Sequence, residues 1–265
     1  MSEQSVLQTI DPNGVATLTL NRPDVHNAFD DHLIAQLTHG LRELDHNVSV
    51  RAVMLAAEGK SFSAGADLNW MRRVARYSEA ENLRDAVGLA GLMRTLNTMT
   101  KPTLARVQGP AFGGGVGLVA CCDIAIASSV AVFSLSEVRL GLIPAVISPY
   151  VIAAIGERNA RRYFLTAERF DAQEALRIGL VHSVVGDGEL DAAVARVQGE
   201  LLKGGPKAIA AAKDLIAHVT GHPIDHVLAE ETASRISQIR VSPEGQEGIA
   251  AFLDKRAPSW TKPKA

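Results

Sequence analysis

The sequence predicts an α/β core followed by a helical C-terminal region. Short apolar strands alternate with helical patterns as far as about residue 142, and beyond Ile143 and Pro144 the pattern becomes almost entirely helical. We therefore divide the chain into a core over residues 1–200 and a helical region over residues 201–265. A chain of 265 residues is long for one domain but can bury a substantial core.

The first third predicts a β-β-α-β arrangement. Alternating apolar and polar residues predict a strand at Val15–Leu20, which ends at the turn sequence of residues 21–24. Leucines and an isoleucine recur at helical spacing over residues 33–44, after two aspartates that favour a first helical turn. Ala52–Ala57 is a short apolar strand.

The rest of the chain alternates first and then becomes helical. Apolar periodicity and the positions of proline and glycine set the expected bounds. The expected helices cover residues 68–77, 80–100, 113–121, 157–165, 172–178, 190–202, 207–219 and 225–239, and the expected strands cover residues 103–107, 123–127, 132–133 and 180–185.

Composition excludes several classes of protein. The net charge of −2 gives no general attraction to nucleic acid. No apolar stretch reaches the roughly 20 residues that span a bilayer, and the N-terminus does not resemble a secretory signal. The adjacent Cys121 and Cys122 are expected to be buried thiols in a reducing compartment. We therefore expect a cytoplasmic protein that binds neither nucleic acid nor membranes.

Two segments of small residues stand out as candidate ligand-binding loops. Residues 61–68 (SFSAGADL) follow a strand and precede a helix, and residues 109–117 (GPAFGGGVG) contain three consecutive glycines before a helix. Both expose backbone N–H groups at a helix start. The second segment has neither the lysine of a Walker loop nor the dinucleotide-binding spacing. Taken alone, each segment is also compatible with an ordinary turn.

A resemblance decides between these alternatives. Short motifs along nearly the whole chain, in the expected order, resemble the enoyl-CoA hydratase/isomerase (crotonase) superfamily. The motifs are LNRP (20–23) with NA (27–28), FSAGADL (62–68), LARVQG (104–109), GGG (113–115), CDI (122–124), FSLSE (133–137), LGLIP (140–144), LTAE (165–168), GLV (179–181) and FLDKR (252–256).

The resemblance implies the crotonase (ClpP-like) α/β fold, a spiral of repeated ββα units with a C-terminal α-helical trimerisation region. It implies a homotrimer, or a hexamer of two trimers. By motif position, the backbone N–H groups of Ala66 and Gly114 would hold the thioester oxygen of an acyl-CoA as it becomes an enolate. Glu137 corresponds to the second catalytic glutamate of the hydratases, and its apolar neighbours favour burial and a raised pKa.

The first catalytic glutamate of the hydratases corresponds to Gly117 here. Together with the sequence that follows Pro144, this departure resembles the bacterial methylglutaconyl-CoA and isohexenylglutaconyl-CoA hydratases, which act on substrates branched at C3. The resemblance therefore favours a hydratase of branched 2-enoyl-CoA thioesters. Two alternatives stay open: a Δ3,Δ2-enoyl-CoA isomerase with Glu137 as its single proton shuttle, and a non-catalytic acyl-CoA-binding subunit.

The resemblance also implies how coenzyme A is held, and it implies no cofactor beyond the CoA of the substrate. The implied contacts lie around His26 and Ala28, along the first loop, and at Lys255, which would come from a neighbouring subunit. The first-loop residues are Ala64, Gly65, Asp67 and Leu68. Arg72, Arg73 and Arg76 are candidate partners for a distal substrate carboxylate.

We expect no metal site. His218, His222 and His226 are spaced four residues apart, but Gly221 and Pro223 interrupt the helix that would present them on one face.

Overall fold

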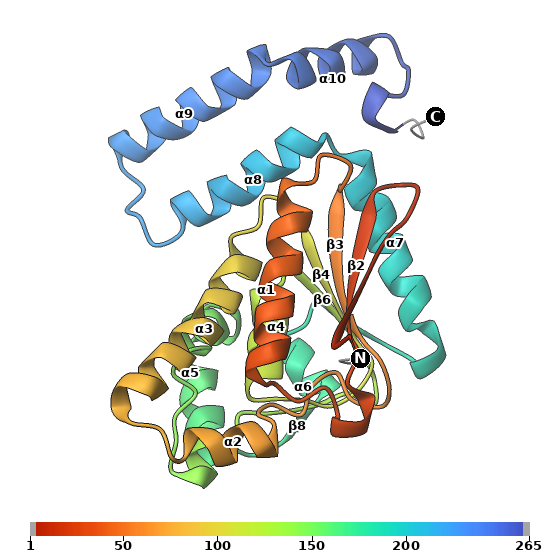
Figure 1. Cartoon of the computed structure of the whole chain (residues 1–265). Helices are drawn as coiled ribbons and strands as arrows, with labels where there is room; N and C mark the ends of the chain where they lie inside the picture. Colours follow the sequence, from red (N-terminus) through yellow and green to blue (C-terminus); the bar gives the residue numbers. More distant parts are fainter. Residues whose placement is uncertain (1–3, 262–265) are drawn as a thin grey trace.

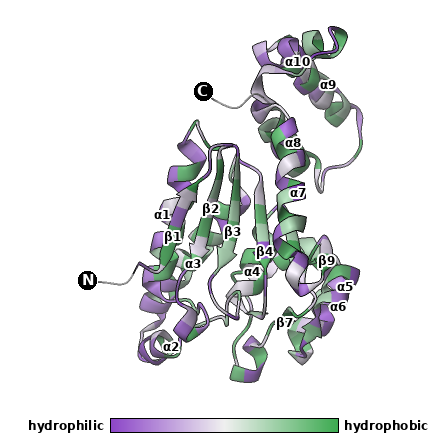
Figure 2. Ribbon diagram, turned by 90° about the vertical axis from the view of Figure 1, so that its right-hand side faces the viewer, coloured by the Kyte–Doolittle hydropathy of each residue, from purple (hydrophilic) through white to green (hydrophobic). Residues whose placement is uncertain are grey.

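The computed structural model describes residues 4–261 and is built around a six-stranded sheet of order β1-β2-β3-β4-β6-β9 (Figure 1). β1 pairs antiparallel with β2, and the other neighbours pair in parallel. The strands are β1 (Val6–Ile10), β2 (Val15–Leu20), β3 (Ala52–Ala57), β4 (Thr103–Val107), β6 (Ile124–Ser128) and β9 (Ser183–Val185). Hydrophobic residues dominate the central strands, as expected for strands covered on both faces (Figure 2).

Helices cover the two faces of this sheet. α1 (Asp31–His46) packs against β1, β2 and α3 (Glu79–Asn97), whereas α7 (Leu190–Lys203) packs against β3, β4 and β6 on the opposite face (Figure 2). α1 begins at Asp30, whose carboxylate accepts a hydrogen bond from the N–H of Leu33 (2.8 Å). Its predicted apolar stripe is buried in the core, which explains why the periodicity predicted this helix correctly.

A second, three-stranded sheet of order β5-β7-β8 lies beside α4 (Gly114–Cys121) and α6 (Ala172–Arg177). Its strands are β5 (Ala111–Phe112), β7 (Val132–Ser134) and β8 (Phe170–Asp171). The stacked rings of Phe133 and Phe170 lie in its core. β5 and β8 escaped the sequence analysis because each has only two residues, too few to show a periodicity.

Helix α5 (Ser148–Thr166) begins nine residues earlier than the sequence predicts, and it carries a break at Gly156, whose φ of 73° is left-handed. Pro149 near its start is compatible with a first helical turn. The short α2 (Leu68–Val74) ends three residues before its predicted end. For both helices the sequence predicted the helix correctly but placed one of its ends wrongly.

The last helices extend beyond one end of the sheet (Figure 1). They are α8 (Pro206–Val219), α9 (His226–Val241) and α10 (Pro243–Leu253), and α10 was not predicted from the sequence. Within residues 4–261, α8 and α9 bury none of their residues, and α10 buries only Ala251. In the same part of the chain, no helix is long and apolar enough to cross a bilayer.

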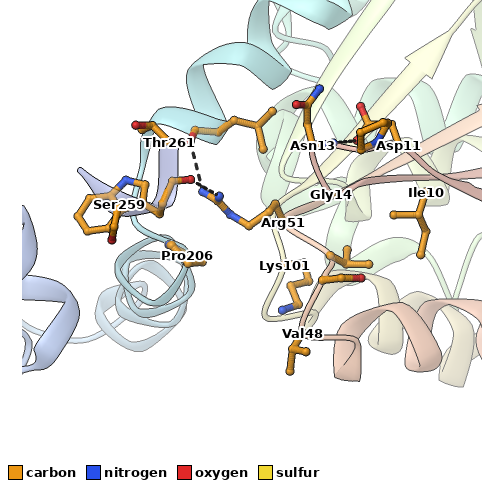
Figure 3. A pocket seen from close by; sticks show the side chains of 15 residues that line it. Ile10, Asp11, Asn13, Gly14, Val48, Arg51, Lys101, Pro206, Ser259 and Thr261 are labelled. Atoms are coloured by element: carbon orange, nitrogen blue, oxygen red, sulfur yellow. Dashed lines mark hydrogen bonds between the residues drawn. The ribbon is translucent and has the colours of Figure 1, made fainter. Parts of the chain in front are cut away.

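Arg51 ties this C-terminal region to the core. Its guanidinium donates hydrogen bonds to the carbonyl oxygens of Leu202 (3.3 Å), Gly204 (2.9 Å) and Trp260 (2.9 Å) at the wall of a pocket of about 370 Å³ (Figure 3). Burial lowers the pKa of Arg51. Because the guanidinium is already hydrogen-bonded to these three carbonyl oxygens, we assign Arg51 a structural role.

Candidate active site

The first candidate loop is anchored by Asn27. This residue is fully buried, and its side-chain amide donates to the carbonyl oxygens of Glu58 (2.8 Å) and Ser61 (2.9 Å). Its side-chain oxygen accepts from the N–H of Arg22 (2.8 Å), and its φ of 53° is one that asparagine tolerates better than most residues. Asn27 therefore fixes the loop after β3 against the turn after β2.

Ala66 presents an unpaired backbone N–H. Its neighbours pair with Phe29: the N–H of Phe29 donates to the carbonyl of Gly65 (2.6 Å), and the N–H of Asp67 donates to the carbonyl of Phe29 (2.8 Å). Successive amides in an extended segment point to opposite sides, so the N–H of Ala66 points away from Phe29. It donates to no acceptor within residues 4–261.

Gly114 presents the second unpaired N–H. It is the first residue of α4, and helix geometry leaves the first N–H groups without an intrahelical acceptor. The preceding amide, that of Gly113, donates to the carbonyl of Ser134 (2.9 Å), but no described acceptor takes the N–H of Gly114. Gly113 has a φ of 50° and a ψ of −117°, which requires glycine.

These two loops meet at one pocket of about 430 Å³. A Cβ atom at residue 65 would lie 3.2 Å from the carbonyl oxygen of Phe112, and a Cβ atom at residue 113 would lie 3.1 Å from a carboxylate oxygen of Glu137. The two loops and Glu137 are therefore in close contact. Ala66, Gly114 and Glu137 all line the pocket. The structure thus brings together the three residues predicted to be catalytic.

Glu137 is the only titratable residue among the described residues that line this pocket. It begins the short 3-10 helix Glu137–Leu140. Its Oε2 is buried and has no hydrogen-bond partner within residues 4–261. Desolvation raises the pKa of this carboxyl group. A buried carboxylate oxygen without a hydrogen-bond partner is costly to the fold, which is characteristic of a group retained for chemistry.

This burial predicts a pH-dependent gain of stability in Glu137→Gln. A carboxyl group whose pKa is raised by folding destabilises the native state when it is ionised, so its cost grows as the pH rises above the ordinary carboxyl pKa. We expect Glu137→Gln to unfold at higher denaturant concentration than the wild type at neutral pH, with the difference disappearing in acid. Glu157→Gln, which removes an exposed carboxylate, is the control, and an equal gain there would contradict this account.

Apart from Ser136, the side chains of the rest of the pocket wall are apolar, and the sequence did not predict them as site residues. Trp70 and Met71 from α2, Leu89 from α3, and Leu142 and Ile147 from the segment before α5 contribute to this wall. Their signals in the sequence are those of ordinary core residues, because the ligand-facing side of an apolar residue is decided only by packing. The wall suits a hydrocarbon chain, and the described residues contain no cluster of three or more side chains that could hold a metal ion.

The surroundings of Gly117 leave no room for the side chain of a second catalytic glutamate. A Cβ at residue 117 would lie 2.3 Å from Cγ2 of Ile147 and 3.2 Å from Cε of Met93. Contacts under about 3 Å between such atoms force a displacement. The space that a glutamate would need is therefore occupied by apolar side chains.

The residues predicted to hold coenzyme A are only partly gathered here. Ala64 and Gly65 line the pocket. The carboxylate of Asp67 is engaged elsewhere: it caps α2 through the N–H groups of Asn69 and Trp70, and it pairs with Arg22 (3.1 Å). The backbone hydrogen bonds and Arg22 together outweigh desolvation and lower the pKa of Asp67. Leu68 begins α2 with an exposed side chain.

The remaining predicted contacts lie outside the pocket lining. His26 accepts at its carbonyl from the N–H of Ala64 (2.9 Å), and the carbonyl of Ala28 accepts from Arg22 (2.6 Å). Lys255 follows α10, at the opposite end of the molecule from α2 (Figure 1). It therefore does not reach the pocket of its own chain.

The three candidate arginines do not line the pocket. Arg73 forms an ion pair with Asp31, and Arg72 donates to the side chain of Asn69 (2.8 Å). The pair of cysteines is buried, and burial raises the pKa of both thiols, that of Cys122 to about 12. Such thiols are poor nucleophiles.

Comparison with known proteins identifies the family. The sequence profile of the enoyl-CoA hydratase/isomerase family matches residues 11–263. The chain belongs to the enoyl-CoA hydratase/isomerase family. An enoyl-CoA hydratase from Shewanella pealeana has a crystal structure that matches with a TM-score of 0.94 and 49% identity, over 97% of this chain and 96% of that one. The predicted crotonase fold is thereby confirmed.

Curated relatives agree with this family. The short-chain-enoyl-CoA hydratase of Clostridium acetobutylicum is 32% identical, with 91% of this chain and 92% of the relative covered. The crotonyl-CoA hydratase of Syntrophomonas wolfei is also 32% identical, with 91% and 92% covered. Both alignments span nearly the full length of the relatives.

Proposed function

We propose that this family member adds water to a 2-enoyl-CoA thioester. The carboxylate of Glu137 removes a proton from water as the water oxygen bonds to C3, and the electron pair of the double bond moves to the thioester oxygen. The N–H groups of Ala66 and Gly114 stabilise that enolate oxygen. The enolate then takes the proton back from Glu137 at C2.

One observation carries this proposal: two backbone amides and a buried carboxylate oxygen, none with a hydrogen-bond partner within residues 4–261, belong to residues that line a single, mainly apolar pocket. Amides of this kind need no reorganisation when negative charge develops, and one preorganised donor contributes about 3–4 kcal/mol to the transition state. The N–H of Gly114 lies at the N-terminus of α4, where the helix dipole favours the negative charge of the enolate oxygen.

We further propose that the substrate is branched at C3, as in 3-methylglutaconyl-CoA or isohexenylglutaconyl-CoA. Glu137 carries out both proton steps of the reaction described above, so the absence of a second glutamate at Gly117 does not prevent hydration of such a substrate. The apolar wall supports the hydrocarbon part of such a substrate. A distal carboxylate would have to reach the pocket mouth near Leu142 and Ile143, because none of the described lining residues is cationic.

A substrate panel tests both levels of this proposal. Purified protein is assayed with crotonyl-CoA, 3-methylcrotonyl-CoA and 3-methylglutaconyl-CoA by the loss of enoyl absorbance. We expect kcat/KM to be at least about tenfold higher for the branched substrates, the discrimination that one methyl group can provide. Much faster turnover of crotonyl-CoA would reject the branched substrate and retain the hydratase.

The single carboxylate also suits a Δ3,Δ2-enoyl-CoA isomerase. A lone Glu137 can carry a proton between C2 and C4 without adding water. Incubation with a 2-enoyl-CoA in deuterated water distinguishes the two reactions. Deuterium incorporation with the enoyl absorbance preserved would establish the isomerase and reject the hydratase.

We propose that α8–α10 mediate assembly into a trimer, or into a hexamer of two trimers, and that Lys255 acts on a neighbouring subunit. Large apolar side chains on these helices are exposed in the single chain, among them Phe252 at 83% and Leu253 at 71%. We expect Phe252→Asp to dissociate the assembly, measured as molar mass by light scattering. Val48→Asp, at an exposed site on the core, should preserve the mass. A monomeric wild type would contradict the proposal.

A further inference from the structure

We propose that Ile147 is the residue that selects a substituent at C3 of the enoyl group. This inference rests on the proposed hydratase function and adds to it the side chain that contacts the C3 substituent and so distinguishes branched from unbranched substrates. It follows from the position of Ile147 relative to the two loops that bind the thioester oxygen.

Ile147 is fixed by packing. It directly precedes α5, is only 3% exposed, and lines the pocket. Its Cγ2 and Cβ lie 2.3 and 2.9 Å from the position that a Cβ of residue 117 would occupy, so its side chain rests on the backbone of Gly117. The absence of a side chain at Gly117 is what admits this branched residue into the wall.

Helix geometry relates this contact to the reacting atoms. Gly117 follows Gly114 by three residues in α4, so both lie on one side of the helix, separated by about 4.5 Å along its axis. The N–H of Gly114 holds the thioester oxygen in the proposed reaction. C3 is the second carbon beyond the thioester carbonyl, a shorter span than this rise, and the side chain of Ile147 extends from Gly117 into the pocket that Gly114 lines. Ile147 is therefore placed beside C3 when the oxygen is bound.

Glu137 approaches from another direction. Its carboxylate lies against Gly113, at the residue just before α4, whereas Ile147 lies one helical turn further along. Water activated by Glu137 can reach C3 from the carboxylate side. The apolar Ile147 side chain excludes water on its own side and offers van der Waals contact to a methyl group there.

The test compares two substrates that differ by one methyl group at C3, crotonyl-CoA and 3-methylcrotonyl-CoA. In Ile147→Ala, the methyl group would face a void, so we expect the ratio of kcat/KM for 3-methylcrotonyl-CoA over crotonyl-CoA to fall by about tenfold. Ile147→Leu removes the Cγ2 methyl group but keeps the volume, and it should lower the ratio in the same direction. It provides the readout if the alanine variant does not fold.

Leu142→Ala is the matched control, because Leu142 lines the same pocket but is not among the nearest neighbours of Gly117. We expect it to change turnover of both substrates alike. An unchanged ratio in both Ile147 variants, a ratio that rises, or an equal fall in Leu142→Ala would overturn the assignment. A wild-type protein without turnover of either substrate would instead refute the proposed hydratase itself.

Discussion

Replacing Glu137 with glutamine is expected to lower kcat for hydration by about 10²–10⁴-fold, the usual contribution of a positioned acid or base. Glutamine keeps the shape of the side chain but cannot remove a proton from water. The amides of Ala66 and Gly114 are unaffected, so acyl-CoA binding should persist. Turnover and the Kd of a saturated acyl-CoA analogue, measured on the same preparation, separate these two effects.

Two comparisons make this result decisive. Glu157→Gln changes an exposed carboxylate on α5 and should retain wild-type turnover. Wild-type rates for Glu137→Gln would remove Glu137 from the chemistry. Absence of turnover in the wild type, with acyl-CoA still bound, would instead favour the non-catalytic acyl-CoA-binding alternative. A parallel loss of affinity would instead show that Glu137 shapes the pocket.

Replacing Gly117 with alanine is expected to destabilise the protein by about 1–3 kcal/mol, the usual cost of inserting a methyl group into a packed core. The new Cβ would meet Ile147 at 2.3 Å, and both residues are buried. Gly117→Glu should be more destabilising still and should not create a working second carboxylate. The free energy of unfolding in denaturant measures both effects.

Gly88→Ala is the matched control for Gly117→Ala. Gly88 lies inside helix α3, and no atom lies within 4 Å of the Cβ that alanine would add. Gly88→Ala should therefore stabilise the protein by up to about 1 kcal/mol, through helix propensity alone. If Gly117→Ala were equally stabilising, Ile147 would be free to move, and its proposed contact with the substrate would lose its support.

The sequence predicted most of the scaffold because its signals are local. β2, β3 and β4 have the predicted bounds, since each is a short alternating or mainly apolar segment bounded by a turn or proline. Helix α1 follows from its apolar spacing and from the two aspartates at its start, of which Asp30 caps the helix in the structure. β5, β8 and α10 were missed, because two-residue strands show no periodicity and α10 buries only Ala251.

The sequence by itself determined the family, and it predicted the two small-residue loops and Glu137 as site residues, because glycine and carboxylate requirements are tied to particular positions in the chain. Only the tertiary structure decided that both amides lack an acceptor among the described residues, that Asp67 is engaged in capping α2, and that Ile147 fills the space beside Gly117. These are contacts between segments distant in sequence. Their chemistry depends on which atoms remain unpaired after packing, and no local pattern encodes that outcome.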